Sequence, residues 1–382
     1  MISRRHFLLG AALAPALRRP QPLPGGRFSG LVPFVAGATP LGRLLGDGLD
    51  ARMFTDLSTI DADSLVTPTE RFFVRTAAPG TLPDSASWTV TVGGLVHEPA
   101  TIDLATLQQS SQPIGRCLIE CAGNADPANY GLMSVADWSG VPISTVLDRV
   151  RPNAAPHRIL VSGFDTDAAS RTSVPGASWI FARDDLRRAF LALQMNGAPL
   201  ARDHGAPVRL VVPGWYGCAC IKWVTRIDLV ADDEKPTSQM WEFANRTHQP
   251  FGSRDASGSL RTGPPALARD YTPAAIDAAA VPIRIEKWIA DGRLSYRIVG
   301  IMWGGEKPTS ALAIRFRSGG GWTPVENCPL PDSTLTWSVW THTWRPVEPG
   351  RYEIVLKVTD PTIRTRRLDL FYYVREVEIG EV

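Results

Sequence analysis

The chain has 382 residues, 44% of them hydrophobic and 20% charged, and 40 Lys and Arg against 38 Asp and Glu give a formal charge of +2. This balance is typical of a globular protein of about two domains and argues against a disordered chain. It also argues against nucleic-acid binding, which needs a surface that neutralises phosphates, and no apolar stretch reaches the ~20 residues of a membrane span.

The N-terminal segment has the pattern of an export signal. Arg4 and Arg5 stand just before the short Ala-rich apolar stretch 7–14, as in a twin-arginine signal. A short basic amphipathic helix is the alternative, but such a helix spreads its charges along one face. We therefore expect residues 1–30 to form the signal and lead-in, and the protein to be periplasmic or otherwise exported by the twin-arginine route.

Residues 31–245 mix short strands with short helices. The run 88–92 alternates with period two and ends at two glycines, which predicts a strand and a turn. Residues 101–107 carry leucines one helical turn apart, which predicts a short helix. Residues 208–212, bounded by prolines, predict a buried strand. Because no regular βαβ period is present, we expect an α+β domain.

The rest of the chain changes character twice. Residues 246–281 are rich in Ala and Pro and are expected to be a linker. Residues 282–382 contain only short alternating strands, which predicts an all-β immunoglobulin-like sandwich without a cysteine pair. This region holds more aromatic residues than one small core needs, which favours an apolar contact patch between copies of the chain. The tryptophans concerned are Trp288, Trp303, Trp322, Trp337, Trp340 and Trp344.

The five cysteines are odd in number and too few for a disulfide scaffold. Cys121 opens an Ala-Gly-Asn turn, whose tight backbone can present the sulfur to a cavity, and a thiolate there would bind a soft metal. Any cysteine taken alone, Cys121 included, is better explained as a small apolar filler of the core. A zinc site shared with Cys117, Cys218 and Cys220 has spacings that fit zinc-binding loops poorly.

Charged and glycine-rich loops flank the expected strand at 208–212. The stretches 202–209 and 213–223 put cationic side chains and free backbone N–H groups near one another, which suits an anionic ligand such as a phosphate. Taken singly, each residue is better explained by structure: Arg209 by pairing with an acid, and His204 by hydrogen bonds within its loop.

Five segments occur in a familiar order and spacing: Phe-Phe-Val-Arg at 72–75, Cys-Ala-Gly-Asn at 121–124, Gly-Phe-Asp at 163–165, the Met-Asn-Gly to His-Gly run at 195–205, and Pro-Val-Arg-Leu-Val-Val-Pro-Gly at 207–214. Together they resemble the signatures of the sulfite oxidase family of molybdopterin oxidoreductases, from about Thr67 to the C-terminus. The resemblance implies a molybdenum-molybdopterin cofactor, an α+β molybdopterin-binding domain, an immunoglobulin-like dimerisation domain after it, and hence a homodimer.

Carried over residue by residue, the resemblance makes Cys121 the thiolate ligand of molybdenum, and Arg75 the residue that meets the substrate anion. These two are the expected catalytic residues. Besides Cys121, the residues expected to hold the cofactor are Phe73, Val74, Arg75, Thr76, Asp165, His204, Arg209, Cys220, Ile221 and Lys222.

This chain departs from the family's substrate pocket at three places. Leu193 stands for a tyrosine, Asp126 for an arginine that helps to bind sulfite, and Ser338 for an arginine supplied by the sandwich domain. Replacing a cation by a carboxylate predicts that sulfite is a poor substrate. The alternative is that another cation, such as Arg116 or Arg171, restores the charge.

We therefore expect a two-electron oxygen-atom transfer on sulfite or a related small oxyanion or oxide substrate. The sequence has no Cys-x-x-Cys-His haem site, so the electrons would pass to an external carrier such as a c-type cytochrome. One alternative is the same centre working in reverse, as a sulfoxide or other oxide reductase. An alternative of another class is a cofactor-free binding protein that kept the fold.

Overall fold

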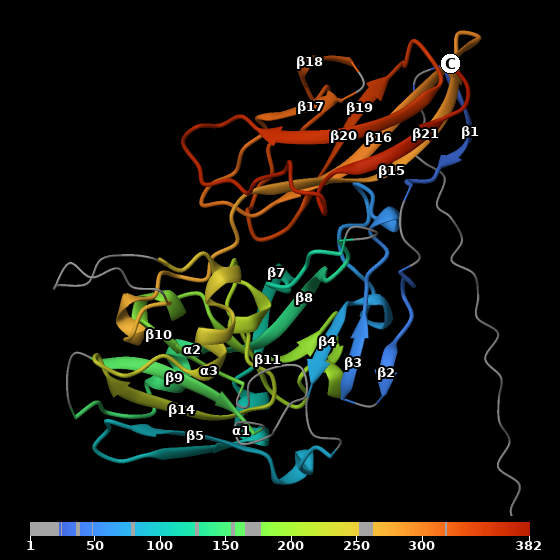
Figure 1. Cartoon of the computed structure of the whole chain (residues 1–382). Helices are drawn as coiled ribbons and strands as arrows, with labels where there is room; N and C mark the ends of the chain where they lie inside the picture. Colours follow the sequence, from blue (N-terminus) through green and yellow to red (C-terminus); the bar gives the residue numbers. More distant parts are fainter. Residues whose placement is uncertain are drawn as a thin grey trace, which may run out of the picture.

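The computed structural model describes residues 23, 25–35, 39–47, 49–77, 81–126, 130–153, 157–164, 177–251, 263–317 and 319–382. The expected export signal, Asp165 and Arg171 lie outside the described residues. Figure 1 shows a mixed body that carries all the labelled helices and, above it, a body of strands. None of the helices in the described part of the chain is long and apolar enough to span a membrane.

The mixed body contains three sheets with short helices around them. Its strands are, in sheet order, β2 (Leu45–Asp47), β3 (Asp50–Met53) and β4 (Val74–Ala77); β12 (Ala198–Pro199), β11 (Phe190–Met195), β8 (Met133–Pro142) and β7 (Gln112–Glu120), with β13 (Arg209–Val211) beside β11; and β10 (Ser178–Phe181), β9 (His157–Gly163), β14 (Val224–Ala231), β5 (Thr89–Gly94) and β6 (Ala100–Asp103). Strands β5 and β14 pair in parallel, whereas β7, β8 and β11 pair antiparallel. The α+β class predicted from the sequence is therefore confirmed.

Helices are few and short in this body. The α-helices are α1 (Leu104–Gln109), α2 (Ile143–Leu147) and α3 (Ser238–Glu242), and the 3-10 turns are η1 (Leu57–Thr59), η2 (Thr69–Arg71), η3 (Ser85–Ser87), η4 (Arg183–Leu186), η5 (Arg202–His204), η6 (Gly217–Ala219), η7 (Ala244–Thr247) and η8 (Ala268–Asp270). The helix expected at 101–107 begins only at Leu104, because Thr101 and Ile102 extend β6 against β5. Asp103 caps that helix by accepting a hydrogen bond from the backbone N–H of Thr106 at 2.8 Å.

The upper body is a sandwich of two four-stranded sheets. The first contains β1 (Gly26–Val32), β15 (Ala279–Ala290), β16 (Arg293–Trp303) and β19 (Ser338–Trp344), and the second contains β18 (Gly319–Pro324), β17 (Leu312–Phe316), β20 (Gly350–Val358) and β21 (Arg375–Ile379). Of the seven strands from β15 to β21, β15, β16 and β19 share one sheet, and β17, β18, β20 and β21 share the other. This is the strand arrangement of an immunoglobulin-like sandwich, as predicted.

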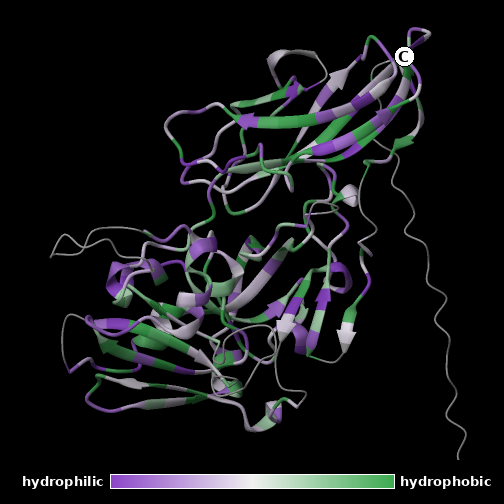
Figure 2. Cartoon of the chain, viewed as in Figure 1, coloured by the Kyte–Doolittle hydropathy of each residue, from purple (hydrophilic) through white to green (hydrophobic). Residues whose placement is uncertain are grey.

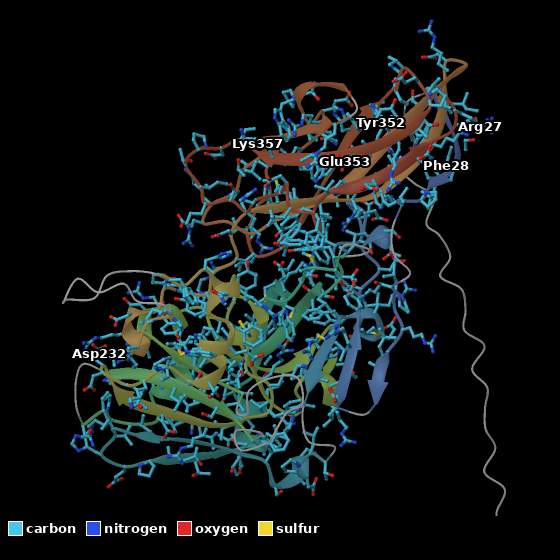
Figure 3. The ribbon with its side chains drawn as sticks, viewed as in Figure 1. Arg27, Phe28, Asp232, Tyr352, Glu353 and Lys357 are labelled. Atoms are coloured by element: carbon cyan, nitrogen blue, oxygen red, sulfur yellow. The ribbon has the colours of Figure 1, made fainter. Side chains whose placement is uncertain are left out.

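Two segments, residues 26–32 and residues 263–278, do not follow the domain boundaries expected from the sequence. Residues 26–32, expected to straddle the lead-in and the catalytic domain, form the edge strand β1, from which Figure 3 labels Arg27 and Phe28. The Phe28 ring packs edge-on against Trp288. Within the expected linker 246–281, residues 263–278 are packed and not extended. Ala274 accepts a hydrogen bond from the N–H of Tyr216 at 2.9 Å, and β15 begins three residues before the expected start of the sandwich.

The tryptophans of the sandwich do not form a contact patch. Five of the six are buried, at 8% exposure or less, and only Trp322 is exposed, at 39%. Hydrophobic and hydrophilic segments alternate along these strands in Figure 2, as in a sheet with one buried face. The aromatic argument for a homodimer interface is therefore wrong, because the sandwich interior uses these side chains.

A buried ion pair joins the two bodies. Glu120, the last residue of β7, has no solvent exposure, and Arg366 donates from Nη1 and Nη2 to its two carboxylate oxygens, both at 2.7 Å. Glu120 also accepts hydrogen bonds from the hydroxyl of Tyr130 at 2.9 Å and from Nε1 of Trp303 at 2.8 Å. Nη1 of Arg366 donates to the hydroxyls of Tyr130 and Tyr373 as well. The carboxylate is thus saturated with donors from both bodies.

A second buried carboxylate strengthens the same boundary. Glu286 on β15 accepts hydrogen bonds from Nε of Arg284 at 2.8 Å and from Nε of Arg297 at 2.7 Å. Arg284 in turn donates to the backbone carbonyls of Ser58 and Ile60, at the end of η1. The sandwich therefore holds a 3-10 turn of the mixed body through a charged side chain.

Replacing Arg366 by Met should lower the free energy of unfolding by about 3–5 kcal/mol, because the Glu120 carboxylate would stay buried without its cation. Denaturant unfolding of the purified chain measures this change. Arg367→Met is the matched control, because the Arg367 side chain is 74% exposed in its pair with Asp369 and should contribute less than about 1 kcal/mol. Equal effects of the two substitutions would contradict this role of the pair.

Candidate active site

Cys121 follows Glu120, the last residue of β7, whose carboxylate contacts Trp303 and Arg366 of the sandwich. The label of β7 in Figure 1 lies on the side of the mixed body nearest the sandwich. Its backbone N–H donates to the carbonyl of Leu132 at 2.9 Å, and its Sγ accepts from the N–H of Gly123 at 3.4 Å. Cys121 is partly exposed as a residue, unlike Cys117, which is buried within β7. The Ala-Gly turn thus holds the sulfur of Cys121 through the N–H of Gly123.

Asn124 closes the turn that holds Cys121. Its N–H donates to the carbonyl of Cys121 at 3.0 Å, and its side-chain oxygen accepts from the N–H of Leu132 at 3.0 Å. Its side-chain nitrogen donates to the carbonyl of Tyr130 at 3.3 Å. One buried amide thus links the turn to the start of β8, and the position of Cys121 depends on it.

Opposed effects act on the Cys121 thiol. Burial raises its pKa, and the nearby Glu120 carboxylate acts in the same direction. The N–H of Gly123 and the cations of Arg75 and Arg246 oppose this rise. Arg246 belongs to η7 and was not among the residues expected from the sequence, since no motif marks it.

The Phe-Phe-Val-Arg segment is held by a buried hydroxyl of β8. The N–H of Phe73 donates to Oγ of Ser134 at 3.0 Å, and that oxygen lies 2.6 Å from Oγ1 of Thr55. Phe72 stacks on Phe73 and meets the ring of His204 edge-on, with centroids 5.3 Å apart. This contact brings the start of β4, which carries Arg75 and Thr76, against η5.

Lys222 joins the same elements from the other side. Its Nζ donates to the carbonyl of Arg75 at 3.3 Å and to that of Asp203 at 2.5 Å. His204 is buried beside them, and burial lowers its pKa to about 4, so its imidazole is neutral at pH 7. Gly205 has a φ of +101°, and a Cβ there would lie 3.1 Å from the Cβ atoms of Arg209 and Lys222, so only glycine fits.

Arg209 is a buried cation on β13. Nη1 donates to the carbonyl of His204 at 2.9 Å and Nη2 to that of Cys220 at 3.4 Å. Its guanidinium lies 5.7 Å from the ring centroid of Trp138, and burial lowers its pKa. Ile221 is buried next to Cys220, and its apolar side chain forms no hydrogen bond. Its backbone carbonyl accepts a hydrogen bond from the N–H of Leu210, which fixes the loop.

The residues brought together here fit a molybdopterin. Buried Arg209 Nε and Thr76 Oγ1 have no hydrogen-bond partner within the described part of the chain. Neither Arg75 nor Arg209 forms an ion pair with any described residue. Buried donors and cations without counter-charges are costly unless an anionic group satisfies them, and a pterin phosphate is such a group. Cys121 would supply the one protein thiolate to the metal.

Some expected residues contribute differently. Val74 is buried in a small cluster with Ala51 and Met53, so its side chain supports β4 from the face of β3. No three His, Cys, Asp or Glu side chains in the described ranges are grouped closely enough to hold a metal ion. The zinc site considered from the cysteine spacing is therefore not formed by described residues, and a metal bound through Cys121 would need ligands from its cofactor.

The structure shows the surroundings of the three residues that depart from the family's substrate pocket, Asp126, Leu193 and Ser338. The Asp126 carboxylate accepts hydrogen bonds from the hydroxyl of Thr39, at 3.0 and 3.2 Å. Its charge also acts to raise the pKa of the buried Arg375 on β21, against the lowering by burial. Leu193 is buried in the core of β11, and Ser338 is buried in β19. Arg116, considered as a replacement cation, pairs with Asp137 at 3.3 Å on an exposed strand. The Asp126 carboxylate thus acts on a cation of the sandwich.

Comparisons with known proteins agree with this site. Residues 78–239 match the model of the oxidoreductase molybdopterin binding domain. The chain is 30% identical to the nitrate reductase [NADPH] of Beauveria bassiana over 63% of this chain and 28% of that protein. It is 28% identical to the sulfite oxidase of Gallus gallus over 78% of this chain and 67% of that protein.

A likeness of fold extends over the whole chain. The crystal structure of the sulfane dehydrogenase SoxCD from Paracoccus pantotrophus superposes with a TM-score of 0.62, at 18% identity, over 98% of this chain and 96% of that chain. The fold and site thus define a molybdopterin-dependent oxidoreductase, with molybdenum-molybdopterin as its cofactor. The chain is similar to sulfite oxidases and nitrate reductases, and its residues 78–239 match the molybdopterin binding domain of such oxidoreductases. It spans about a quarter to a third of two of the curated relatives, the Beauveria bassiana nitrate reductase and the Drosophila melanogaster sulfite oxidase.

Cys121→Ser should reduce turnover of the cofactor-loaded protein at least about a hundredfold, because it replaces the only protein thiolate expected on the metal. The fold should survive, since one sulfur-to-oxygen change at a partly exposed site costs little packing. Steady-state turnover and a thermal melt measure the two effects. Cys117→Ser should keep its activity, and the reverse pattern would refute the assignment of Cys121.

Proposed function

We propose that this protein oxidises a small oxyanion, sulfite or a close relative, by two-electron oxygen-atom transfer. The observation that carries the proposal is the convergence of two cations, Arg75 and Arg246, on the partly exposed thiol of Cys121. Bound molybdenum would supply the redox chemistry and the transferable oxygen. The chain's own residues bind and orient an anion beside that metal.

Each predicted residue then has a definite task. Arg75 binds the substrate anion, and its carbonyl is held by Lys222, which keeps β4 against η5. Arg209 satisfies the negative charge of the pterin phosphate from within the protein, where a buried cation interacts strongly. His204 is neutral at pH 7 and offers a hydrogen bond without adding charge.

The structure changes the argument about sulfite. The sequence predicts poor sulfite binding because Asp126 replaces an arginine, but the Asp126 carboxylate accepts hydrogen bonds from Thr39 and acts on Arg375 of the sandwich. Arg246 supplies a cation from another element. We therefore propose sulfite as a substrate, and the missing hydroxyl at Leu193 should weaken its binding less than a lost charge would.

Asp126→Asn tests this directly. If the carboxylate lies outside the pocket, removing its charge should change the Michaelis constant for sulfite by less than about twofold. Steady-state oxidation with ferricyanide as acceptor measures the constant. If the Michaelis constant for sulfite is lower by tenfold or more in Asp126→Asn, then Asp126 repels the substrate, as the sequence alone predicts.

A second candidate is the reverse reaction, reduction of an oxide. The likeness to nitrate reductases favours it, including one of Nicotiana tabacum at 33% identity over 42% of this chain. Purified protein should oxidise sulfite with ferricyanide faster than it reduces nitrate with a reduced viologen dye. Faster nitrate reduction would instead support the reductase. A folded protein that contains no molybdenum would support the cofactor-free binding protein.

The protein is also proposed to be exported and to give its electrons to an external carrier such as a c-type cytochrome. The support is the twin-arginine pattern and the absence of a Cys-x-x-Cys-His haem motif from the sequence. We likewise propose the homodimer implied by the family resemblance, although the tryptophans no longer support it. The molar mass of the cofactor-loaded protein, measured by light scattering, distinguishes a dimer from a monomer.

Replacing both Arg4 and Arg5 by Lys should keep the protein in the cytoplasm, because the twin-arginine machinery reads that pair. Fractionation of expressing cells shows where the molybdenum-loaded protein accumulates. Replacing Arg18 and Arg19, which lie beyond the apolar stretch, is the control and should leave export unchanged. Equal export of both variants would contradict the signal assignment.

A further inference from the structure

Arg246 reaches the Cys-Ala-Gly turn from a distant part of the chain. It lies on η7, just after α3, and its Nη1 is 3.0 Å from the position that a Cβ on Gly123 would occupy. The same position is 3.7 Å from Sγ of Cys121. The guanidinium and the sulfur therefore flank one point, and the missing side chain of Gly123 leaves that point open.

The backbone of η7 holds this arginine firmly. The N–H of Arg246 donates to the carbonyl of Phe243 at 3.0 Å, and its guanidinium carbon lies 5.7 Å from the Phe243 ring centroid. Thr247 is buried, and Gln249, also buried, donates to Oγ1 of Thr247 at 3.2 Å and to the carbonyl of Thr272. The turn is anchored by its buried residues, while Arg246 itself is exposed and accessible to a solute.

The charge of Arg246 is not neutralised by its surroundings. It forms no ion pair with any residue that the structure describes, and the same holds for Arg75. The carboxylate of Asp126, in the loop after Gly123, is turned to Thr39. Two cations that form no ion pair with described residues, beside the partly exposed Cys121, create a positive potential that attracts a small anion.

We propose that Arg246 binds the anionic substrate at the molybdenum site, together with Arg75, and thereby selects small oxyanions over neutral substrates. The inference rests on the proposed function and adds the residue that sets substrate charge. It explains how this chain compensates for the arginine that Asp126 replaces. Arg246 would act in binding, while Cys121 and the cofactor set the rate of the chemical step.

Equilibrium binding of sulfate to the cofactor-loaded protein separates this role from activity. We expect Arg246→Gln to weaken sulfate binding at least tenfold in titration calorimetry, since it removes one charge-assisted contact. Arg246→Lys keeps the positive charge but loses the paired N–H donors of the guanidinium. Its affinity for sulfate should therefore lie between those of the parent protein and Arg246→Gln. Arg351→Gln is the matched control, because Arg351 is an exposed arginine on β20 of the sandwich, and it should bind sulfate as the parent does.

The kinetic prediction is equally specific. Arg246→Gln should raise the Michaelis constant for sulfite at least tenfold and change kcat less than threefold. Unchanged sulfate binding in Arg246→Gln, or a parent protein that binds no sulfate, would overturn the role of Arg246 whatever the enzyme oxidises. If the parent binds sulfate through Arg246 but does not oxidise sulfite, the binding role stands and the proposed reaction fails.

Discussion

The bidentate ion pair of Glu120 and Arg366 is the constraint on which the rest of the site depends. Glu120 has no exposure to solvent, and the next residue in the chain is Cys121. A buried carboxylate is tolerated only where its lone pairs are satisfied, and here donors come from both bodies. The sandwich thereby fixes the end of β7, and with it the start of the turn that presents the sulfur.

This arrangement gives the sandwich domain a structural role beside the active site. The sandwich sends Arg366 and Trp303 to the carboxylate beside Cys121, and Arg284 to the carbonyls that end η1. The two bodies also share one hydrophobic core. Movement of either body would displace charged groups from buried partners, so the geometry around the thiol is held by the whole chain.

Local patterns predicted much of the fold. The alternating runs after residue 282 predicted the sandwich, because a half-buried strand must alternate, and the Cys-Ala-Gly-Asn turn predicted the presentation of Cys121. The helix expected at 101–107 was half wrong, because Thr101 and Ile102 suit a strand edge and β5 was available to pair with them. The strand at 26–32 was missed because its partner β15 lies more than 250 residues away.

The site was predictable only where motifs carry it. Arg75, His204, Arg209 and Lys222 lie in recognisable segments, and the structure brings them together through backbone carbonyls. Arg246 lies in a polar 3-10 turn without any pattern, and only the fold places it beside Gly123. The sequence likewise could not show where the Asp126 carboxylate points, and this direction decides whether it repels an anion.

The central claim is that one thiolate of this chain, held beside a buried interdomain ion pair, binds molybdenum. X-ray absorption at the molybdenum edge of the purified, oxidised protein tests it most directly. The account predicts three sulfur ligands on molybdenum in the parent protein, two from the pterin and one from Cys121, and two in Cys121→Ser. An identical sulfur count in both proteins, or no molybdenum in the folded parent, would contradict it.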